Sequence, residues 1–164
     1  MPSVAIVTLG CPKNQVDSEA MASLLRQGGF TLVENPSETN FIIVNTCGFI
    51  ETARAESINE LRVLASAKEQ GQRLVAAGCL AELNPKLLLR EVQGLDALLG
   101  TRRWHEIVAL LRQLNNGVGV PLVWIGDSRR PMPQPKRFPL GATAYVKIAE
   151  GCDWRQWMVY TDRF

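Results

Sequence analysis

Short runs of continuous apolar residues alternate along the chain with longer segments in which apolar residues recur every three to four positions. The apolar runs are Val4-Ala5-Ile6-Val7, Phe41-Ile42-Ile43-Val44, Leu74-Val75-Ala76-Ala77 and Ala97-Leu98-Leu99. Continuous runs of this kind are typical of parallel strands covered on both faces, and the wider spacing is typical of helices. The alternation predicts an α/β domain with an open parallel sheet, flavodoxin-like or Rossmann-like, and helices on both faces.

The helical segments have recognisable starts and stops. They are expected to begin at Asn14, to cover roughly 52–70, to run from Asn84-Pro85 to about 92, and to run from Thr101 to the stop at Asn115-Asn116-Gly117. Asn14 is the expected N-cap of the first helix, with Asp17 at its third position, and Thr101 is the expected cap of the last. Short polar side chains at these positions accept hydrogen bonds from the unpaired N–H groups of a first turn.

The composition is typical of a globular protein and limits the kinds of partner that we expect the chain to bind. Of the 164 residues, 46% are apolar and 21% charged, so the chain can bury a core. The net charge is +2, and acids and bases are interleaved along most of the chain, so we do not expect direct nucleic-acid binding. No apolar run approaches the roughly 18 residues needed to span a bilayer, and the N-terminus lacks a signal-peptide pattern. We expect a cytoplasmic protein that does not contact membranes.

A change of composition predicts a domain boundary near residue 128. Residues 1–127 are expected to form the N-terminal domain, 128–141 a stiff linker rich in proline and arginine, and 142–164 the start of a second domain with a strand at 142–149. The basic residues of the linker are Arg129, Arg130, Lys136 and Arg137. Solvated linker charges are the default interpretation, and contact with RNA is the alternative.

Three of the four cysteines lie just beyond predicted strands, where helices are expected to begin. Cys11, Cys47 and Cys79 could therefore meet at one edge of the sheet, although 36 and 32 residues separate them along the chain. Helix N-termini also favour the thiolate form, which is the form that binds metal. Three soft thiolates favour an iron-sulfur cluster over zinc, because zinc sites normally complete a tetrahedron with a fourth protein ligand. The chain has one histidine, His105, which is expected to be solvated or partly packed rather than a ligand. Buried, inert cysteines remain the alternative on spacing alone.

Polar residues beside these cysteines have two possible roles. Asn14, Asp17 and Ser18 could shape the cluster loop, although helix capping is the expected role of Asn14 and Asp17. Asn45 and Thr46 could hydrogen-bond to cluster sulfurs, or could form only the ordinary hydrogen bonds of a strand end.

The residues around the cysteines resemble a known family. The motifs are Thr8-Leu9-Gly10-Cys11-Pro12-Lys13-Asn14, Val16-Asp17-Ser18-Glu19, Val44-Asn45-Thr46-Cys47-Gly48-Phe49-Ile50 and Gly78-Cys79-Leu80. In this order, over about residues 3–115, they resemble the N-terminal domain of the radical-SAM methylthiotransferases. The residues after Cys11 and Cys47 are more similar to the branch that modifies an aspartate of a small-subunit ribosomal protein than to the branch that modifies a transfer-RNA adenosine.

The resemblance implies an enzyme with two clusters. Residues matching Cys11, Cys47 and Cys79 hold an auxiliary 4Fe-4S cluster that has one iron without a protein ligand. A following barrel domain holds a second cluster and binds S-adenosylmethionine, which is cleaved to a radical. The implied partners are the ribosomal protein substrate, the iron-sulfur assembly machinery and an electron donor.

The chain departs from the family pattern near its end. The segment 145–153 matches the first barrel strand and places Cys152 as the first cysteine of a C-x3-C-x2-C motif, but Gln156 and Val159 stand where the other two are expected. Cys152 is therefore expected to be a leftover thiol, and 142–164 a truncated start of the radical-SAM barrel. We predict no methylthiotransferase activity for this polypeptide alone, which methylthiolated product from the purified chain would contradict.

Two alternatives to the ribosomal-protein branch are kept. One is a fragment of a transfer-RNA adenosine methylthiotransferase, and the other is a non-catalytic flavodoxin-like binding module with structural cysteines. Nucleotide binding is not expected, because Cys11-Pro12-Lys13-Asn14 stands where a Gly-rich phosphate loop would follow the first strand.

Overall fold

The computed structural model of the chain describes residues 1–117 and 121–128, which form one six-stranded sheet covered by helices. The strands are β1 (Ser3–Thr8), β2 (Thr31–Leu32), β3 (Phe41–Thr46), β4 (Arg73–Gly78), β5 (Ala97–Gly100) and β6 (Leu122–Trp124). The helices are α1 (Pro12–Gln27), α2 (Glu51–Ala67), α3 (Cys79–Leu83), α4 (Pro85–Glu91) and α5 (Ile107–Asn115), with 3-10 turns at Pro36–Glu38 and Trp104–Glu106. All neighbouring strands pair in parallel, in the order β2-β1-β3-β4-β5-β6, which confirms the predicted open parallel sheet.

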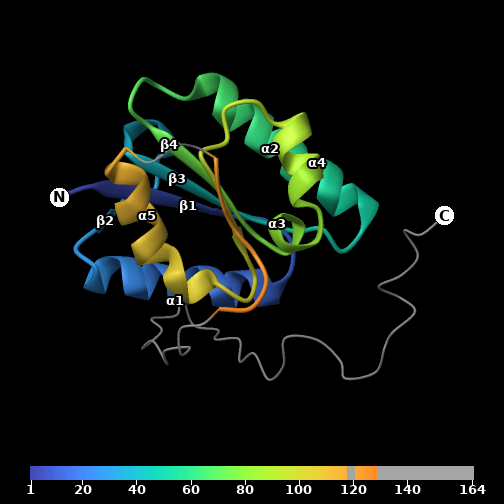
Figure 1. Cartoon of the computed structure of the whole chain (residues 1–164), viewed down its shortest axis with the longest axis horizontal. Coiled ribbons are helices and arrows are strands. Elements are labelled where there is room, and N and C mark those ends of the chain that lie inside the picture. Colours follow the sequence, from blue (N-terminus) through green and yellow to red (C-terminus); the bar gives the residue numbers. More distant parts are fainter. Residues whose placement is uncertain (118–120, 129–164) are drawn as a thin grey trace.

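Helices cover both faces of this sheet, as the apolar runs predict. Figure 1 shows α1 and α5 on one side of the strands and α2, α3 and α4 on the other. Alternate strand residues divide between the two cores: Ile43 and Val75 pack with α1 and α5, whereas Val44 and Leu74 pack with α2, α3 and α4. The central strands are buried on both faces, which is why they read as continuous apolar runs rather than as alternating ones.

The register brings the ends of four strands to one edge of the sheet. Thr8 of β1 pairs with Asn45 of β3, and Thr46 pairs with Gly78 of β4, which pairs in turn with Gly100 of β5. The strand order also reverses between β1 and β3, because β2 lies on the far side of β1. Sheets of this type bind ligands outside the carboxyl ends of their strands at such a reversal.

Two predicted helix caps are wrong. Helix α1 begins at Pro12 with Cys11 in the cap position and no side-chain cap hydrogen bond, so Asn14 is inside the helix. Proline suits the first turn because that position needs no N–H donor. The segment after β5 first forms the 3-10 turn that Arg103 precedes, and α5 begins only at Ile107, so Thr101 caps neither element.

The other differences concern element ends and short elements. Helix α2 covers 51–67 rather than 52–70, and neither α3 nor β6 was expected. Both unexpected elements are five residues or shorter, too short to show a period in the sequence. The described part ends at Ser128, so the rest of the predicted linker, the segment 142–164 and Cys152 lie outside it. No helix among the described residues is long and apolar enough to cross a membrane.

Candidate functional site

Cys11, Cys47 and Cys79 follow the carboxyl ends of the adjacent strands β1, β3 and β4. Cys11 is exposed at the start of α1, Cys47 is 6% exposed in the loop between β3 and α2, and Cys79 is partly exposed as the first residue of α3. All three thiols are free rather than paired in disulfides. Chain segments that are far apart in the sequence therefore meet at the predicted edge of the sheet.

Gly10 brings the loop of Cys11 against the side chain of Cys47. Its φ is +86°, a conformation that residues with a Cβ rarely adopt. A Cβ added there would lie 2.5 Å from the Cys47 Cβ and 2.8 Å from the Cys47 Sγ. The missing side chain is therefore what lets the first cysteine loop lie on the second cysteine.

The side chain of Asn14 joins all three cysteine loops. It is fully buried, and its Nδ2 donates hydrogen bonds to the carbonyl oxygen of Leu9 at 2.9 Å and to that of Thr46 at 3.0 Å. Its Oδ1 accepts a hydrogen bond from the Sγ of Cys79 at 3.8 Å. Since both amide protons are used by carbonyl groups, the amide oxygen has to face the thiol. Asn14 is a link between the loops, and not the helix cap expected from the sequence.

The polar residues at the end of β3 complete this hydrogen-bond network. The side-chain amide of Asn45 donates to the main-chain oxygen of Asn14 at 2.8 Å and to the Oγ of Ser18 at 2.9 Å. Thr46 donates from its hydroxyl to the carbonyl oxygen of Ala77 at 2.6 Å. Thr46 thus joins the end of β3 to β4, and Asn45 joins it to the first turns of α1.

Ser57 fixes the main chain of Cys47, a role that the sequence did not indicate. Its buried hydroxyl accepts a hydrogen bond from the Cys47 N–H and donates one to the Cys47 carbonyl oxygen, both at 3.0 Å. Serine inside a helix gives no recognisable signal, because its partner lies ten residues earlier in the chain. The loop after β3 is thereby held to α2.

Replacing Ser57 by alanine is expected to lower the free energy of unfolding by about 2–3 kcal/mol, because both buried polar groups of Cys47 would lose their partner. Urea denaturation measures the change. Ser66→Ala in the same helix is the matched control, since among residues 1–117 and 121–128 its exposed hydroxyl bonds only to Val63 of its own helix. It should change the free energy by less than about 1 kcal/mol. Equal effects of the two substitutions would contradict the role of Ser57.

The thiol of Cys79 is electrostatically coupled to the rest of the site. Burial raises its pKa above the ordinary value, the nearby Lys13 ammonium lowers it, and the neighbouring Cys47 and Cys11 raise it further, with burial dominant. Cys79 is therefore a neutral thiol at neutral pH, consistent with its S–H donating to Asn14. Binding of a metal has to displace this proton.

The predicted ligands and the predicted non-ligand lie in different surroundings. His105 lies in the turn before α5, its ring 5.7 Å from that of Trp104, and its two ring nitrogens have no hydrogen-bond partner among residues 1–117 and 121–128. In the same part of the chain, no three His, Cys, Asp or Glu side chains are arranged to hold a single metal ion as they stand. What the structure brings together at the sheet edge is the loops of the three thiols.

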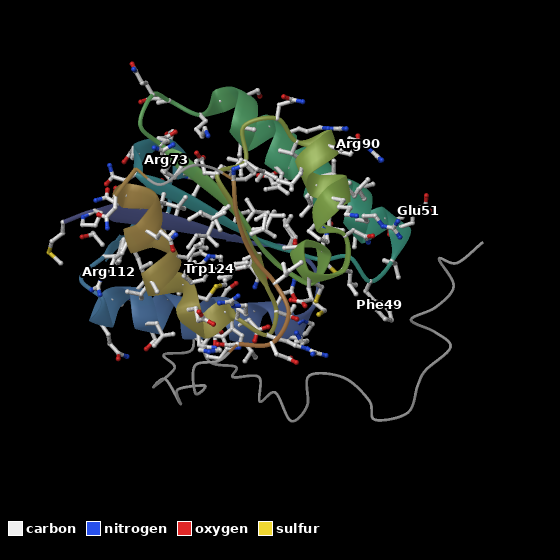
Figure 2. All side chains as sticks on the ribbon, viewed as in Figure 1. Phe49, Glu51, Arg73, Arg90, Arg112 and Trp124 are labelled. Carbon is white, nitrogen blue, oxygen red and sulfur yellow. The ribbon has the colours of Figure 1, made fainter. Side chains whose placement is uncertain are left out.

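Two surface features adjoin the cysteines. A groove of about 590 Å³ starts at Cys11 and runs between α1 and the strands β1 and β2, towards Arg26 and Glu34. Phe49 and Ile50, which Gly48 separates from Cys47, are 64% and 54% exposed, and Figure 2 shows Phe49 projecting from the edge of the ribbon. The site therefore opens to the surface beside an exposed apolar pair.

Known proteins match this chain in the segments that contain the three cysteines. The model of the family described as "Uncharacterized protein family UPF0004" matches residues 3–100, which include all three cysteines. The chain is 44% identical to the ribosomal protein uS12 methylthiotransferase RimO of Chloroflexus aurantiacus over 166 aligned positions, covering 92% of this chain and 36% of that protein. It is 43% identical to the RimO protein of Desulforamulus reducens, covering 93% of this chain and 35% of that protein, and 40% identical to that of a Synechococcus strain, covering 94% and 33%.

The chain spans about a third of the length of these relatives, and the part it matches is their N-terminal domain. The match to the family model covers more than half of the chain and includes the strands β1 to β5 that position the three cysteines. The protein therefore belongs to the UPF0004 family and is similar to the N-terminal domain of the RimO methylthiotransferases.

Proposed function

We propose that Cys11, Cys47 and Cys79 together bind one 4Fe-4S cluster. The observation that carries the proposal is the contact of the three cysteine loops through the buried amide of Asn14. Three thiol side chains at one sheet edge fit the donor preference of iron-sulfur clusters, which are held by cysteine thiolates. When bound, such a cluster would supply an iron with an open position, at which a sulfur species could bind.

The residues of the chain have distinct tasks in this proposal. Asn14 and Ser57 hold the cysteine loops in place, and Gly10 allows the close approach of the first two. Lys13 favours the thiolate form of Cys79 against the effect of burial. The hydrogen bonds of Asn14 to Leu9 and Thr46 do not involve a thiol, so they keep the loops of Cys11 and Cys47 together while the thiols change protonation.

We further infer that this domain, of about residues 1–127, belongs to a methylthiotransferase that acts on ribosomal protein uS12. The support is the name shared by the relatives described above, together with the motifs around the three cysteines. The enzyme would also need S-adenosylmethionine with its second cluster, iron-sulfur assembly proteins and an electron donor. Free thiols at the site agree with a reducing compartment such as the cytoplasm.

Anaerobic reconstitution with iron and sulfide tests the cluster. The purified chain is expected to bind about four irons with about four sulfides and to become brown, because thiolate-to-iron charge transfer absorbs visible light. Iron and acid-labile sulfide analyses measure the stoichiometry. A colourless, stable, iron-free protein would instead support the alternative of a flavodoxin-like binding module with structural cysteines.

A further inference from the structure

Glu82 ties the helix that begins at Cys79 to the ends of two other strands. It lies three residues after Cys79 in α3, and its Oε1 accepts a hydrogen bond of 2.9 Å from the N–H of Gly126, just beyond β6. Its Oε2 is buried and has no hydrogen-bond partner within the described ranges. A carboxylate oxygen is expensive to bury in this way, so the surrounding contacts must hold it there.

The space for this carboxylate is created by Gly100 at the end of β5. A Cβ on Gly100 would lie 1.7 Å from the Glu82 Oε2 and 2.9 Å from its Cδ, while the nearest main-chain atom, the Cα of Ile125, would be 3.2 Å away. Gly100 is not among the glycines with positive φ, so a side chain there would not strain the backbone. The obstacle to a larger residue is mainly the Glu82 carboxylate itself.

We propose that Glu82 is a positioning residue for the Cys79 thiol. Helix α3 has only five residues, and a helix of that length has little stability of its own, so contacts with other elements must set its orientation. Asn14 holds the Cys79 end of the helix, and Glu82 holds the other end against β5 and β6. The inference rests on the proposed function only in treating Cys79 as a ligand, because the position of the thiol can be measured without any cluster.

Gly100→Ala tests the proposal, because it should displace the carboxylate at small cost to the fold. The measurement is the rate at which iodoacetamide alkylates each cysteine in the cluster-free 164-residue chain at one pH, resolved by mass spectrometry. The alkylation rate of Cys79 is expected to change by about threefold or more, which corresponds to the small end of the interaction energies between residues in contact. The rates of Cys11 and Cys47 should stay the same. Glu82→Ala should reproduce the change. Glu82→Gln should stay close to the unsubstituted protein, because its amide oxygen can still accept from Gly126.

A double substitution decides whether the effect passes through Glu82. In a Glu82→Ala background, Gly100→Ala should produce no further change at Cys79, since the atoms it displaces are gone. An unchanged rate at Cys79 in both single variants, or a full Gly100 effect in the Glu82→Ala background, would overturn the proposal. If Gly100→Ala does not fold, the Cys79 rates of the two Glu82 variants decide the matter. Hydrogen exchange of the Gly126 amide then shows whether each variant has lost or kept the hydrogen bond to residue 82. A chain that binds no iron would reject the cluster and leave these thiol measurements interpretable.

Discussion

Replacing Asn14 by alanine is expected to lower the free energy of unfolding by about 2–4 kcal/mol and to remove most of the iron bound after reconstitution. The first effect follows because the buried carbonyl groups of Leu9 and Thr46 would both lose their donor. The second follows because the same amide holds the loops of Cys11 and Cys47 together beside the thiol of Cys79, through hydrogen bonds that do not depend on a thiol proton. Urea denaturation and iron analysis measure the two effects separately.

Two comparisons make the Asn14 result specific. Asn84→Ala is the matched control, because Asn84 also stands at the start of a helix but makes no side-chain cap hydrogen bond, so its loss should change the free energy of unfolding by less than about 1 kcal/mol. Asn14→Asp preserves the shape but sets a carboxylate against two carbonyl oxygens, and should bind less iron than the unsubstituted chain. Normal iron content in both Asn14 variants would show that the amide does not organise the site.

Gly78→Ala is expected to have the largest effect of any glycine substitution at the site. Gly78 joins β4 to Cys79 with φ +94° and ψ −158°, a conformation essentially restricted to glycine. A Cβ there would also lie 2.3 Å from the Asn45 Oδ1 and 2.6 Å from the Thr46 carbonyl oxygen. Backbone strain and steric clash together should lower the free energy of unfolding by about 3 kcal/mol or more.

Gly71→Ala separates the two causes. Gly71 has nearly the same φ, +93°, but a Cβ there would meet no atom within 4 Å. The strain of the positive φ should therefore be its only cost, about 1–2 kcal/mol. Urea denaturation of both variants measures the difference, which contains the share due to close packing of Gly78 against the end of β3. Equal losses of stability would mean that this close packing has no energetic weight.

The sheet and its helices could be predicted from the sequence because their signals are local. Strands such as β3 are buried on both faces and appear as continuous apolar runs, and the apolar face of α2 appears as a helical period. The convergence of Cys11, Cys47 and Cys79 was predictable from the strands themselves, because the carboxyl ends of neighbouring parallel strands lie at a common edge of the sheet.

The contacts that build the site could not be predicted in this way. Asn14 looks like a helix cap because capping is a local preference, but its actual partners Thr46 and Cys79 are 32 and 65 residues away. Ser57 and Glu82 carry no motif, and their roles follow from what lies beside them once the sheet has formed. Short polar side chains have several competing partners, and the tertiary structure decides among them.

The most direct test of the cluster compares iron content across single cysteine substitutions. Cys11→Ala, Cys47→Ala and Cys79→Ala are each expected to lose most of the iron and the visible absorption after anaerobic reconstitution, because each removes one of three thiolate ligands. Cys152→Ala, the matched control, is expected to retain about four irons per chain. Unchanged iron content and spectrum in any one of the first three variants would contradict the claim that these three cysteines hold a single cluster.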